Sequence, residues 1–263
     1  MAELAARAAR HMFDERKARA TFHNLPDDLR SGDEAGVYAI QDGLHGLLQN
    51  NGAGARAGYK IALSTATMQK MLGTDRPCMG ALFANSIWPS PCTLGHSDYV
   101  HLGMECEVAV RLGADLVPGD TPFTRASVAP AVATCHAAFE VIDDRDADYG
   151  ASDAFSLIAD NCWNAGVVLG PEVSDWQTID FGASRGSLIV NGDEVASGLL
   201  SDAMGHPFEA LAWLANLMAE RGLMIEHGAL IMTGSIVPTT FVQPGDQVTY
   251  RADNLGDVSA RIV

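Results

Sequence analysis

One stretch determines how the whole sequence is interpreted: His101-Leu102-Gly103-Met104-Glu105-Cys106-Glu107-Val108-Ala109-Val110. Side chains alternate between the two faces of a β-strand, so Glu105 and Glu107 should point the same way and Cys106 the other way. Two like charges on one face repel, and burying them without a partner is costly. The stretch is therefore either a strand end with two solvated glutamates or a buried pair that shares a cation.

The composition narrows the classes of partner. The chain has 263 residues, 48% of them hydrophobic and 19% charged, which suits one large domain with a sizeable core. Its formal net charge of −16 argues against nucleic acid, whose phosphates need Lys and Arg, and against an anionic membrane surface. Five widely spaced cysteines without a C-x-x-C pair indicate reduced thiols. With no signal peptide and no apolar run of about 20 residues, the sequence predicts a cytoplasmic protein.

A helical N-terminal portion precedes a body of short strands. Apolar residues at helical spacing predict one helix over 2–20 and a second one, capped by Asp33, that ends at Asn51-Gly52. We place the boundary between residues 1–57 and the body, residues 58–263. The strands expected in the body cover 58–63, 105–112, 139–142, 167–169, 187–190, 194–197, 229–233, 247–251 and 258–263. The helices expected there cover 65–72, after a Ser64 cap, 124–136, 153–160 and 207–220.

Turn residues further define the predicted fold, and two common nucleotide-binding motifs are absent from the sequence. Asn191-Gly192 is a strong hairpin signal, and the prolines within 88–94 indicate a loop or an edge segment. The body lacks the regular alternation of a doubly wound sheet, which predicts an α+β fold. It also lacks a G-x-G-x-x-G sequence after a strand and a P-loop, so nucleotide binding has no support.

A third acidic residue lies in another apolar, strand-like segment. Glu140 is part of Phe139-Glu140-Val141-Ile142-Asp143, and alone it would be interpreted as solvated or salt-bridged. Together with Glu105 and Glu107 it makes three carboxylates. Three hard oxygen ligands, with no patterned His or Cys nearby, favour Mg²⁺, Mn²⁺ or Ca²⁺ over Zn²⁺.

Six motifs, in order along nearly the whole chain, resemble the 2-keto-4-pentenoate hydratases of the fumarylacetoacetate hydrolase superfamily. They are Gly58-Tyr59-Lys60-Ile61, Met104-Glu105-Cys106-Glu107, Phe139-Glu140-Val141-Ile142-Asp143-Asp144-Arg145, Ile158-Ala159-Asp160-Asn161, Gly205-His206-Pro207 with Trp213-Leu214-Ala215, and Met232-Thr233-Gly234. The resemblance implies a mixed β-sandwich roll with flanking helices, preceded by the helical N-terminal portion. It implies that residues 58–263 form the metal-binding catalytic domain.

The resemblance also assigns roles to residues. It carries Glu105, Glu107 and Glu140 over as ligands of Mg²⁺ or Mn²⁺, and Lys60 as an acid/base or substrate-binding residue. A Lys beside a cation in a partly dry pocket has its charged form disfavoured, so we expect Lys60 to exchange protons near neutral pH. Implied substrate contacts involve Asp160 and Asn161, with helix capping as the alternative, and Thr233 and Gly234, with a plain strand exit as the alternative.

Four further residues receive structural interpretations. Asp144-Arg145 is expected to form a local ion pair that braces Glu140. His206 is expected to cap the helix that follows it, and His101 to be structural, since strand geometry separates it from the metal.

The chain departs from the family pattern in two stretches. Pentenoate hydratases usually have an acidic residue where this chain has Cys78, and small residues where Cys162 and Trp163 follow Asn161. If Cys78 and Trp163 line the pocket, a carboxylate is lost and a large indole is added. In that case we expect the metal chemistry to survive while the substrate, or even the proton-transfer step, changes.

The leading hypothesis is a metal-dependent hydro-lyase that adds water to a 2-hydroxy-2,4-dienoate in aromatic-compound catabolism and forms a 4-hydroxy-2-oxo acid. Alternatives from the same superfamily are a 4-oxalocrotonate-type decarboxylase, an acylpyruvate hydrolase and an oxaloacetate tautomerase or decarboxylase. A catalytically silent partner subunit is a further alternative. The implied ligand is a small 2-oxo acid or its dienol. The resemblance also implies a homo-oligomer, with an aldolase or decarboxylase of the same pathway as a candidate partner.

Overall fold

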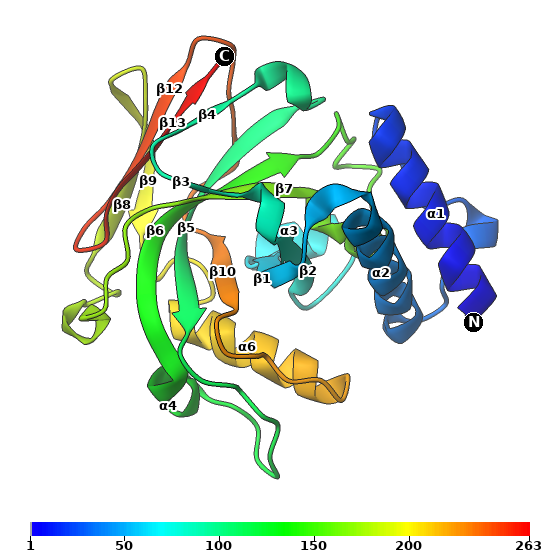
Figure 1. The fold of residues 1–263 in the computed structure, drawn as a ribbon, viewed down its shortest axis with the longest axis horizontal. Helices are drawn as coiled ribbons and strands as arrows, with labels where there is room; N and C mark the ends of the chain where they lie inside the picture. Colours follow the sequence, from blue (N-terminus) through cyan, green and yellow to red (C-terminus); the bar gives the residue numbers. More distant parts are fainter. Residues whose placement is uncertain (1) are drawn as a thin grey trace.

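The computed structural model describes residues 2–263 and contains two β-sheets with helices around them, an α+β fold (Figure 1). The larger sheet has eight strands in the order β2-β1-β10-β5-β6-β7-β3, with β11 beside β5. Its strands are β1 (Arg56–Ala62), β2 (Cys78–Phe83), β3 (Ile87–Pro89), β5 (Leu102–Leu112), β6 (Val132–Asp143), β7 (Asn164–Leu169), β10 (Leu230–Ser235) and β11 (Thr240–Phe241).

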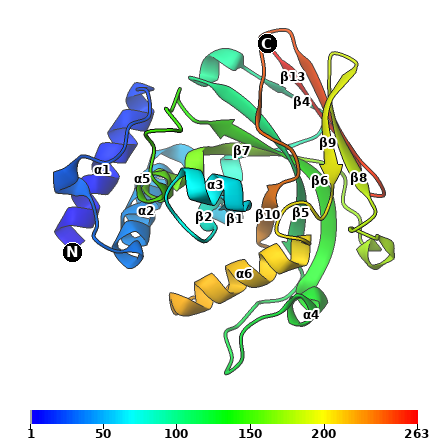
Figure 2. The ribbon, with the colours of Figure 1, turned by 180° about the vertical axis from the view of Figure 1, so that it is seen from behind.

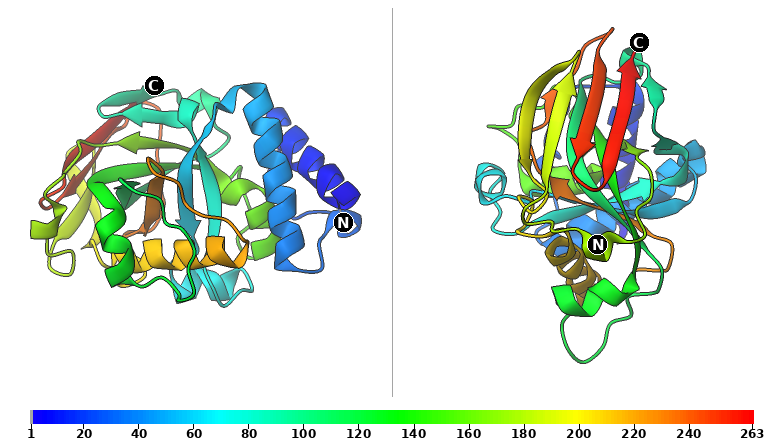
Figure 3. Two further views of the ribbon diagram at one scale, coloured as in Figure 1. Left: turned by 60° about the horizontal axis from the view of Figure 1, so that its bottom comes forward. Right: turned by 90° about the vertical axis from the view of Figure 1, so that its left-hand side faces the viewer.

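The smaller sheet has five strands in the order β4-β13-β12-β8-β9 and faces the viewer on the right of Figure 3. Its strands are β4 (Cys92–Leu94), β8 (Arg185–Val190), β9 (Asp193–Leu199), β12 (Gln247–Ala252) and β13 (Gly256–Ile262). The hairpin predicted at Asn191-Gly192 is confirmed, because both residues adopt positive φ between β8 and β9. The two sheets pack around one shared apolar core.

The helices are α1 (Ala2–Ala18), α2 (Glu34–Leu48), α3 (Ala66–Met71), α4 (Arg125–Val128), α5 (Ala154–Ala159) and α6 (Pro207–Glu220). Helices α1 and α2 lie at the end of the molecule opposite the five-stranded sheet, and α6 runs beneath β10 (Figures 1 and 2). The Asp33 side chain caps α2, as predicted, by accepting the N–H of Gly36. None of the helices described here is long and apolar enough to cross a membrane.

The N-terminal helices share a core with the sheets. Met12 of α1 and Ile40 of α2 belong to the same buried cluster as Phe139 of β6. Buried polar bonds also join the two parts, since the Gln41 amide donates to the carbonyls of Met79 and Ile158. The domain boundary after residue 57 stays a prediction. The parts on its two sides share one buried core and buried hydrogen bonds.

The structure shows that one predicted helix and one predicted cap are wrong and that one buried strand was missed. The helix expected over 124–136 is wrong: α4 ends at Val128 and β6 begins at Val132. The reason is Pro130, which supports a short turn but cannot continue an α-helix, followed by β-branched residues that favour a strand. Strand β2, whose six residues are all buried, was not predicted. Thr65, not Ser64, caps α3.

Candidate metal centre and cavity

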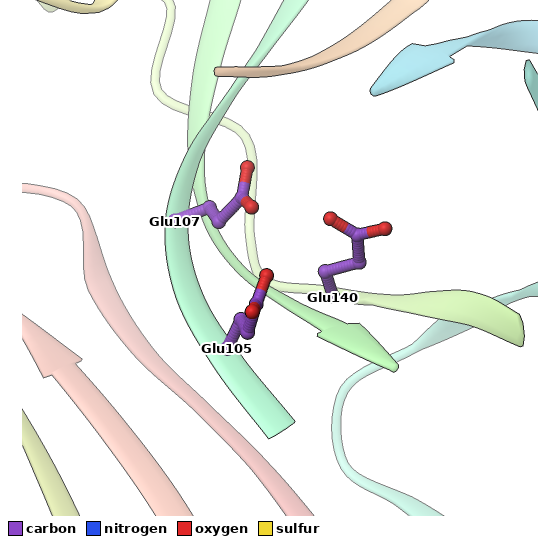
Figure 4. A group of neighbouring side chains, drawn as sticks. All are labelled: Glu105, Glu107 and Glu140. Atoms are coloured by element: carbon purple, nitrogen blue, oxygen red, sulfur yellow. The ribbon is translucent and has the colours of Figure 1, made fainter. Parts of the chain in front are cut away.

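Three carboxylates converge on one face of the eight-stranded sheet (Figure 4). Glu105 and Glu107 come from β5 and Glu140 from β6, and the antiparallel register places Glu105 directly opposite Glu140. One oxygen of each carboxylate lies within 4.8 Å of the others. Cys106 points to the opposite face and is buried, as the period of two predicted. The solvated interpretation of the two glutamates is wrong for Glu107, which is fully buried.

Each carboxylate is held through one of its oxygens. The Thr239 hydroxyl donates to Oε1 of Glu105. The Gly234 N–H donates to Oε2 of Glu107 over 2.8 Å, and the Asn164 amide donates to Oε1 of Glu140 over 2.8 Å. Gly234 has a φ of +104°, a conformation that suits glycine. The surrounding polar groups therefore fix the directions in which the remaining oxygens point.

Those remaining oxygens fit a divalent cation. Within residues 2–263, Oε1 of Glu107 and Oε2 of Glu140 are buried without a hydrogen-bond partner. Buried acceptors are rarely left unpaired, and a carboxylate even less so. Three carboxylates face a single ammonium, that of Lys60, so a divalent cation would balance the charge. The oxygen-only donor set favours Mg²⁺, Mn²⁺ or Ca²⁺.

The carboxylates strongly perturb one another. Burial, reinforced by Glu140 and Glu105, raises the pKa of Glu107 well above its ordinary value. Burial also raises the pKa of Glu140, although the ammonium of Lys60 opposes this. Both shifts mean that the ionised triad destabilises the fold unless positive charge compensates it.

Lys60 on β1 supplies part of that compensation. Its Nζ lies 3.2 Å from Oε1 of Glu140, and its side chain is only 3% exposed. Burial acts to lower the pKa of Lys60, but Glu140 and the neighbouring acidic groups hold it above its ordinary value. A cation at the triad would act in the same direction as burial. The lowering expected from the sequence depends on that cation and stays a prediction.

A cavity of about 510 Å³ opens beside the triad. Lys60 and Glu105 line it together with Ser235, the last residue of β10, and Thr239, which lies on the segment after that strand. Trp163, which the sequence analysis considered as a pocket residue, also lines it, as does the neighbouring Cys162. The structure thus brings Lys60, Trp163 and one carboxylate of the triad, that of Glu105, to one cavity.

The segment Asn161–Trp163 has an unusual backbone, since all three residues adopt positive φ, between +52° and +61°. The Asn161 side chain holds this conformation: it donates to the carbonyl and accepts from the N–H of Ala81, and it bonds Nε2 of His45. Cys78 is buried, with its Sγ 3.6 Å from that of Cys162. The segment is a rigid support that presents Cys162 and Trp163 to the cavity.

Four predicted substrate contacts have other partners and are not among the residues that line the cavity. The Asp160 carboxylate accepts from Arg16 and Arg145, and Asn161 and Cys78 are engaged as described above. The Thr233 hydroxyl donates to the carbonyl of Val108. Their substrate-binding roles stay predictions, and these contacts favour the alternative structural roles. Asp160 directly follows α5 as its C-terminal cap residue.

The expected Asp144–Arg145 ion pair is wrong. The Arg145 guanidinium pairs instead with the Asp160 carboxylate at 3.0 Å. Asp144 accepts from the Tyr149 hydroxyl and bonds Nδ1 of His101. Arg145 has a φ of +50°, which directs its side chain away from that of its neighbour.

Two histidines behave as the sequence predicted. His101 stacks on Phe241 with ring centroids 3.7 Å apart, which fits its structural interpretation. Nδ1 of His206 accepts the N–H of Phe208 over 3.0 Å, so His206 is the cap of α6.

The sequence interpretation missed three residues of the site: Asn164 and Thr239, which donate to carboxylates of the triad, and Tyr149, which lines the cavity. Asn164 is the first residue of β7 and is buried. A polar amide at the start of an apolar strand is the feature of the sequence that could have identified it. Thr239 and Tyr149 lie outside regular strands and helices, so no periodic pattern identifies them.

Comparisons with known proteins agree with this geometry. The family model described as fumarylacetoacetate (FAA) hydrolase C-terminal matches residues 73–263. The chain is 32% identical to a 2-keto-4-pentenoate hydratase of Burkholderia vietnamiensis, over 91% of this chain and 90% of that protein. It is 31% identical to a 4-oxalocrotonate decarboxylase of Pseudomonas putida, over 97% and 95% of the two chains.

Among solved structures, a 4-oxalocrotonate decarboxylase from Pseudomonas putida G7, complexed with magnesium and adipate, superimposes with a TM-score of 0.92. The sequence identity is 28%, and the match covers 100% of this chain and 98% of that one. A second structure of the decarboxylase, complexed with calcium and acetate, gives a TM-score of 0.89.

Proposed function

Because the chain belongs to the fumarylacetoacetate hydrolase family, with 2-keto-4-pentenoate hydratases among its relatives, we propose that it is a metal-dependent hydratase of 2-hydroxy-2,4-dienoates in the breakdown of aromatic compounds. The observation that carries the proposal is the pair of unpartnered oxygens, on Glu107 and Glu140, beside a cavity that Lys60 lines. A cation ligated there would be accessible to a small 2-oxo acid.

The chemistry divides between the metal and the chain. Mg²⁺ or Mn²⁺, when bound, supplies a Lewis acid that stabilises the enolate of the substrate. Glu105, Glu107 and Glu140 would hold the ion, with Gly234 and Asn164 fixing the carboxylates. Lys60 carries the positively charged group that pairs with Glu140 and lines the cavity, and we assign to its Nζ the binding of the substrate or the transfer of a proton.

The proposed reaction adds one molecule of water to the dienol and releases nothing. The dienol loses the proton of its 2-hydroxyl and gains one at C5, which leaves a double bond between C3 and C4. Water then contributes its hydroxyl to C4 and a proton to C3. The product is a 4-hydroxy-2-oxo acid, and no oxidant or reductant is required.

The second candidate is a decarboxylase of the 4-oxalocrotonate type. It is favoured by the TM-score of 0.92 to such an enzyme, whose structure holds adipate, a dicarboxylate. Both activities use a metal-stabilised enolate, so the triad and Lys60 serve either. We also propose that the chain forms a homo-oligomer, as the family resemblance implies, which light scattering after size-exclusion chromatography tests.

One assay separates the two activities. Loss of the dienol absorbance of 2-hydroxypenta-2,4-dienoate is followed with Mg²⁺, with Mn²⁺ and with EDTA, while CO₂ release from 4-oxalocrotonate is measured in parallel. We expect metal-dependent loss of the dienol and formation of 4-hydroxy-2-oxopentanoate. Release of CO₂ without conversion of the dienol would support the decarboxylase and contradict the hydratase.

A further inference from the structure

We propose that the cavity selects substrates with an uncharged, apolar C5 substituent and rejects those with a second carboxylate at that end. This inference rests on the proposed function and names the substrate class of the same site. It separates the chain from the decarboxylase that it superimposes on, although the two folds are closely similar.

The walls of the cavity beyond the triad are predominantly apolar. Its apolar side chains include Met68, Leu72, Ile142, Leu157, Trp163 and Phe241. They come from α3, its C-terminal end, β6, α5, β11 and the segment before β7, so several elements contribute apolar surface to the cavity. An alkyl or aryl group placed there loses apolar contact with water.

Two of these walls are fixed by aromatic packing. The Trp163 ring meets Phe22 and Tyr149 edge to face, with centroids 5.2 Å apart in both pairs. Phe241 is stacked on His101 at 3.7 Å. Trp163 also lies on the left-handed segment that Asn161 holds in place. A pocket with such rigid walls discriminates by shape instead of adapting to each ligand.

The charges that line the cavity leave a second carboxylate without a partner. Among the described lining residues, the charged ones are Lys60, Glu105 and Asp202. Lys60 is already paired with Glu140 at 3.2 Å. Asp202 is acidic and accepts the N–H of Leu199, so it repels an incoming anion. A desolvated carboxylate without a cation is strongly disfavoured.

The nearby arginines do not change this conclusion. Arg145 is buried against Asp160, and Arg76 pairs with Glu34 outside the cavity. The hydroxyls of Ser64 and Thr67 line the cavity but carry no charge. At about 510 Å³, the cavity falls in the range of roughly 300–1,000 Å³ that is usual for small-molecule sites. It has room for a substituent beyond the metal-chelating end of the substrate.

The test compares two substrates that share one reacting end. One is 2-hydroxyhexa-2,4-dienoate, with a methyl group on C5, and the other is 2-hydroxyhexa-2,4-dienedioate, with a carboxylate there. With Mg²⁺ present, we expect kcat/KM for hydration to be at least about 100-fold higher for the methyl compound. Calorimetric binding of unreactive 2-oxohexanoate and 2-oxoadipate should show the same order of affinity.

A variant that adds a positive charge to the cavity wall tests the inference without removing a residue that the fold needs. Met68 is half-buried in the cavity wall, so Met68→Lys should be tolerated and should provide the missing cation. Met68→Gln is the matched polar control. We expect Met68→Lys to raise kcat/KM for the dicarboxylate at least about tenfold over Met68→Gln, without a parallel gain for the methyl compound.

The outcomes distinguish this inference from the function on which it rests. If neither dienoate nor 2-hydroxypenta-2,4-dienoate is hydrated, the proposed function fails and the inference with it. If 2-hydroxypenta-2,4-dienoate is hydrated but the dicarboxylate reacts as fast as the methyl compound, the hydratase stands and the inference is overturned. Tighter binding of 2-oxoadipate than of 2-oxohexanoate would also overturn it.

Discussion

The ammonium of Lys60 lies 3.2 Å from Oε1 of Glu140, and both side chains are almost completely buried. The two residues come from β1 and β6, which are separated in the sheet by β10 and β5. Asn164 donates to the same carboxylate oxygen, and Oε2 of Glu140 is buried without a hydrogen-bond partner. Lys60, which lines the cavity, is therefore joined by an ion pair to Glu140, a candidate metal ligand.

Replacing Lys60 by Met should destabilise the fold by about 3–5 kcal/mol, because it leaves the Glu140 carboxylate buried beside two other acids. Urea unfolding with EDTA present measures this. The double variant Lys60→Met/Glu140→Gln should recover most of the loss, since it removes both charges. Simple additivity of the two single effects would contradict the buried pair. Neither variant should retain hydratase activity.

Glu107→Gln should raise the melting temperature in EDTA by at least about 2 °C, because the raised pKa of Glu107 shows that its charge opposes folding. The same variant should lose the stabilisation that Mn²⁺ gives to the unaltered protein. Glu172→Gln, at an exposed position, is the control and should change neither value. Undiminished stabilisation of Glu107→Gln by Mn²⁺ would remove Glu107 from the metal site.

Asn164→Ala should weaken Mn²⁺ binding by about 10–100-fold in calorimetric titration, because the amide orients Glu140 without itself joining the triad. Arg16 of α1 donates to the carbonyl of Asn164 over 3.0 Å, so Arg16→Met should produce a smaller loss in the same direction. The exposed Asn51→Ala is the control. Unchanged affinity in Asn164→Ala would show that Glu140 needs no such support.

His45 should make the fold less stable as the pH falls. Burial lowers its pKa from 6.5 in the unfolded chain to about 4 in the fold, so between these values the unfolded state binds the additional proton. Stability is therefore retained above pH 6.5 and lost as the pH falls through this window, by about 2 kcal/mol at pH 5.

Urea unfolding of the unaltered protein and of His45→Gln at pH 7.5 and pH 5 tests this. Gln removes the titrating ring while its amide can still donate to Asn161. The difference in unfolding free energy between the two pH values should shrink by about 2 kcal/mol in His45→Gln. It should not change in His23→Gln, at an exposed position. An identical pH dependence in all three proteins would refute the role of His45.

The local part of the site could be predicted from the sequence. The period of two placed Glu105 and Glu107 on one face, and the need for a cation followed from elementary electrostatics. The position of Glu140 depends on the register between β5 and β6, which pairs it with Glu105, 35 residues earlier in the chain. No local sequence pattern encodes this register. The residues alone grouped Glu140 with Glu105 and Glu107 as a possible third ligand, whereas the resemblance to a known family, rather than periodicity, assigned it that role and added Lys60.

Errors arose where local preference and tertiary context disagree. Residues 124–128 begin as a helix, with Thr124 as cap, but Pro130 stops it and the buried sheet takes up Val132 onward. The neighbouring Asp144 and Arg145 suggested a pair, yet the positive φ of Arg145 sends its side chain to Asp160. Contacts of Asn164 and Thr239 require the folded chain, because each reaches a carboxylate distant in sequence.

Addition of water to C4 of a dienoate is the step that defines the proposed hydratase, and oxygen labelling detects this step. The protein is incubated with 2-hydroxypenta-2,4-dienoate and Mg²⁺ in H₂¹⁸O, and the product is returned to ordinary water so that its ketone oxygen exchanges back before mass spectrometry. We expect one retained ¹⁸O atom, on C4, that is absent with EDTA and in Glu107→Gln. Metal-dependent consumption of the dienol with no retained ¹⁸O would contradict it.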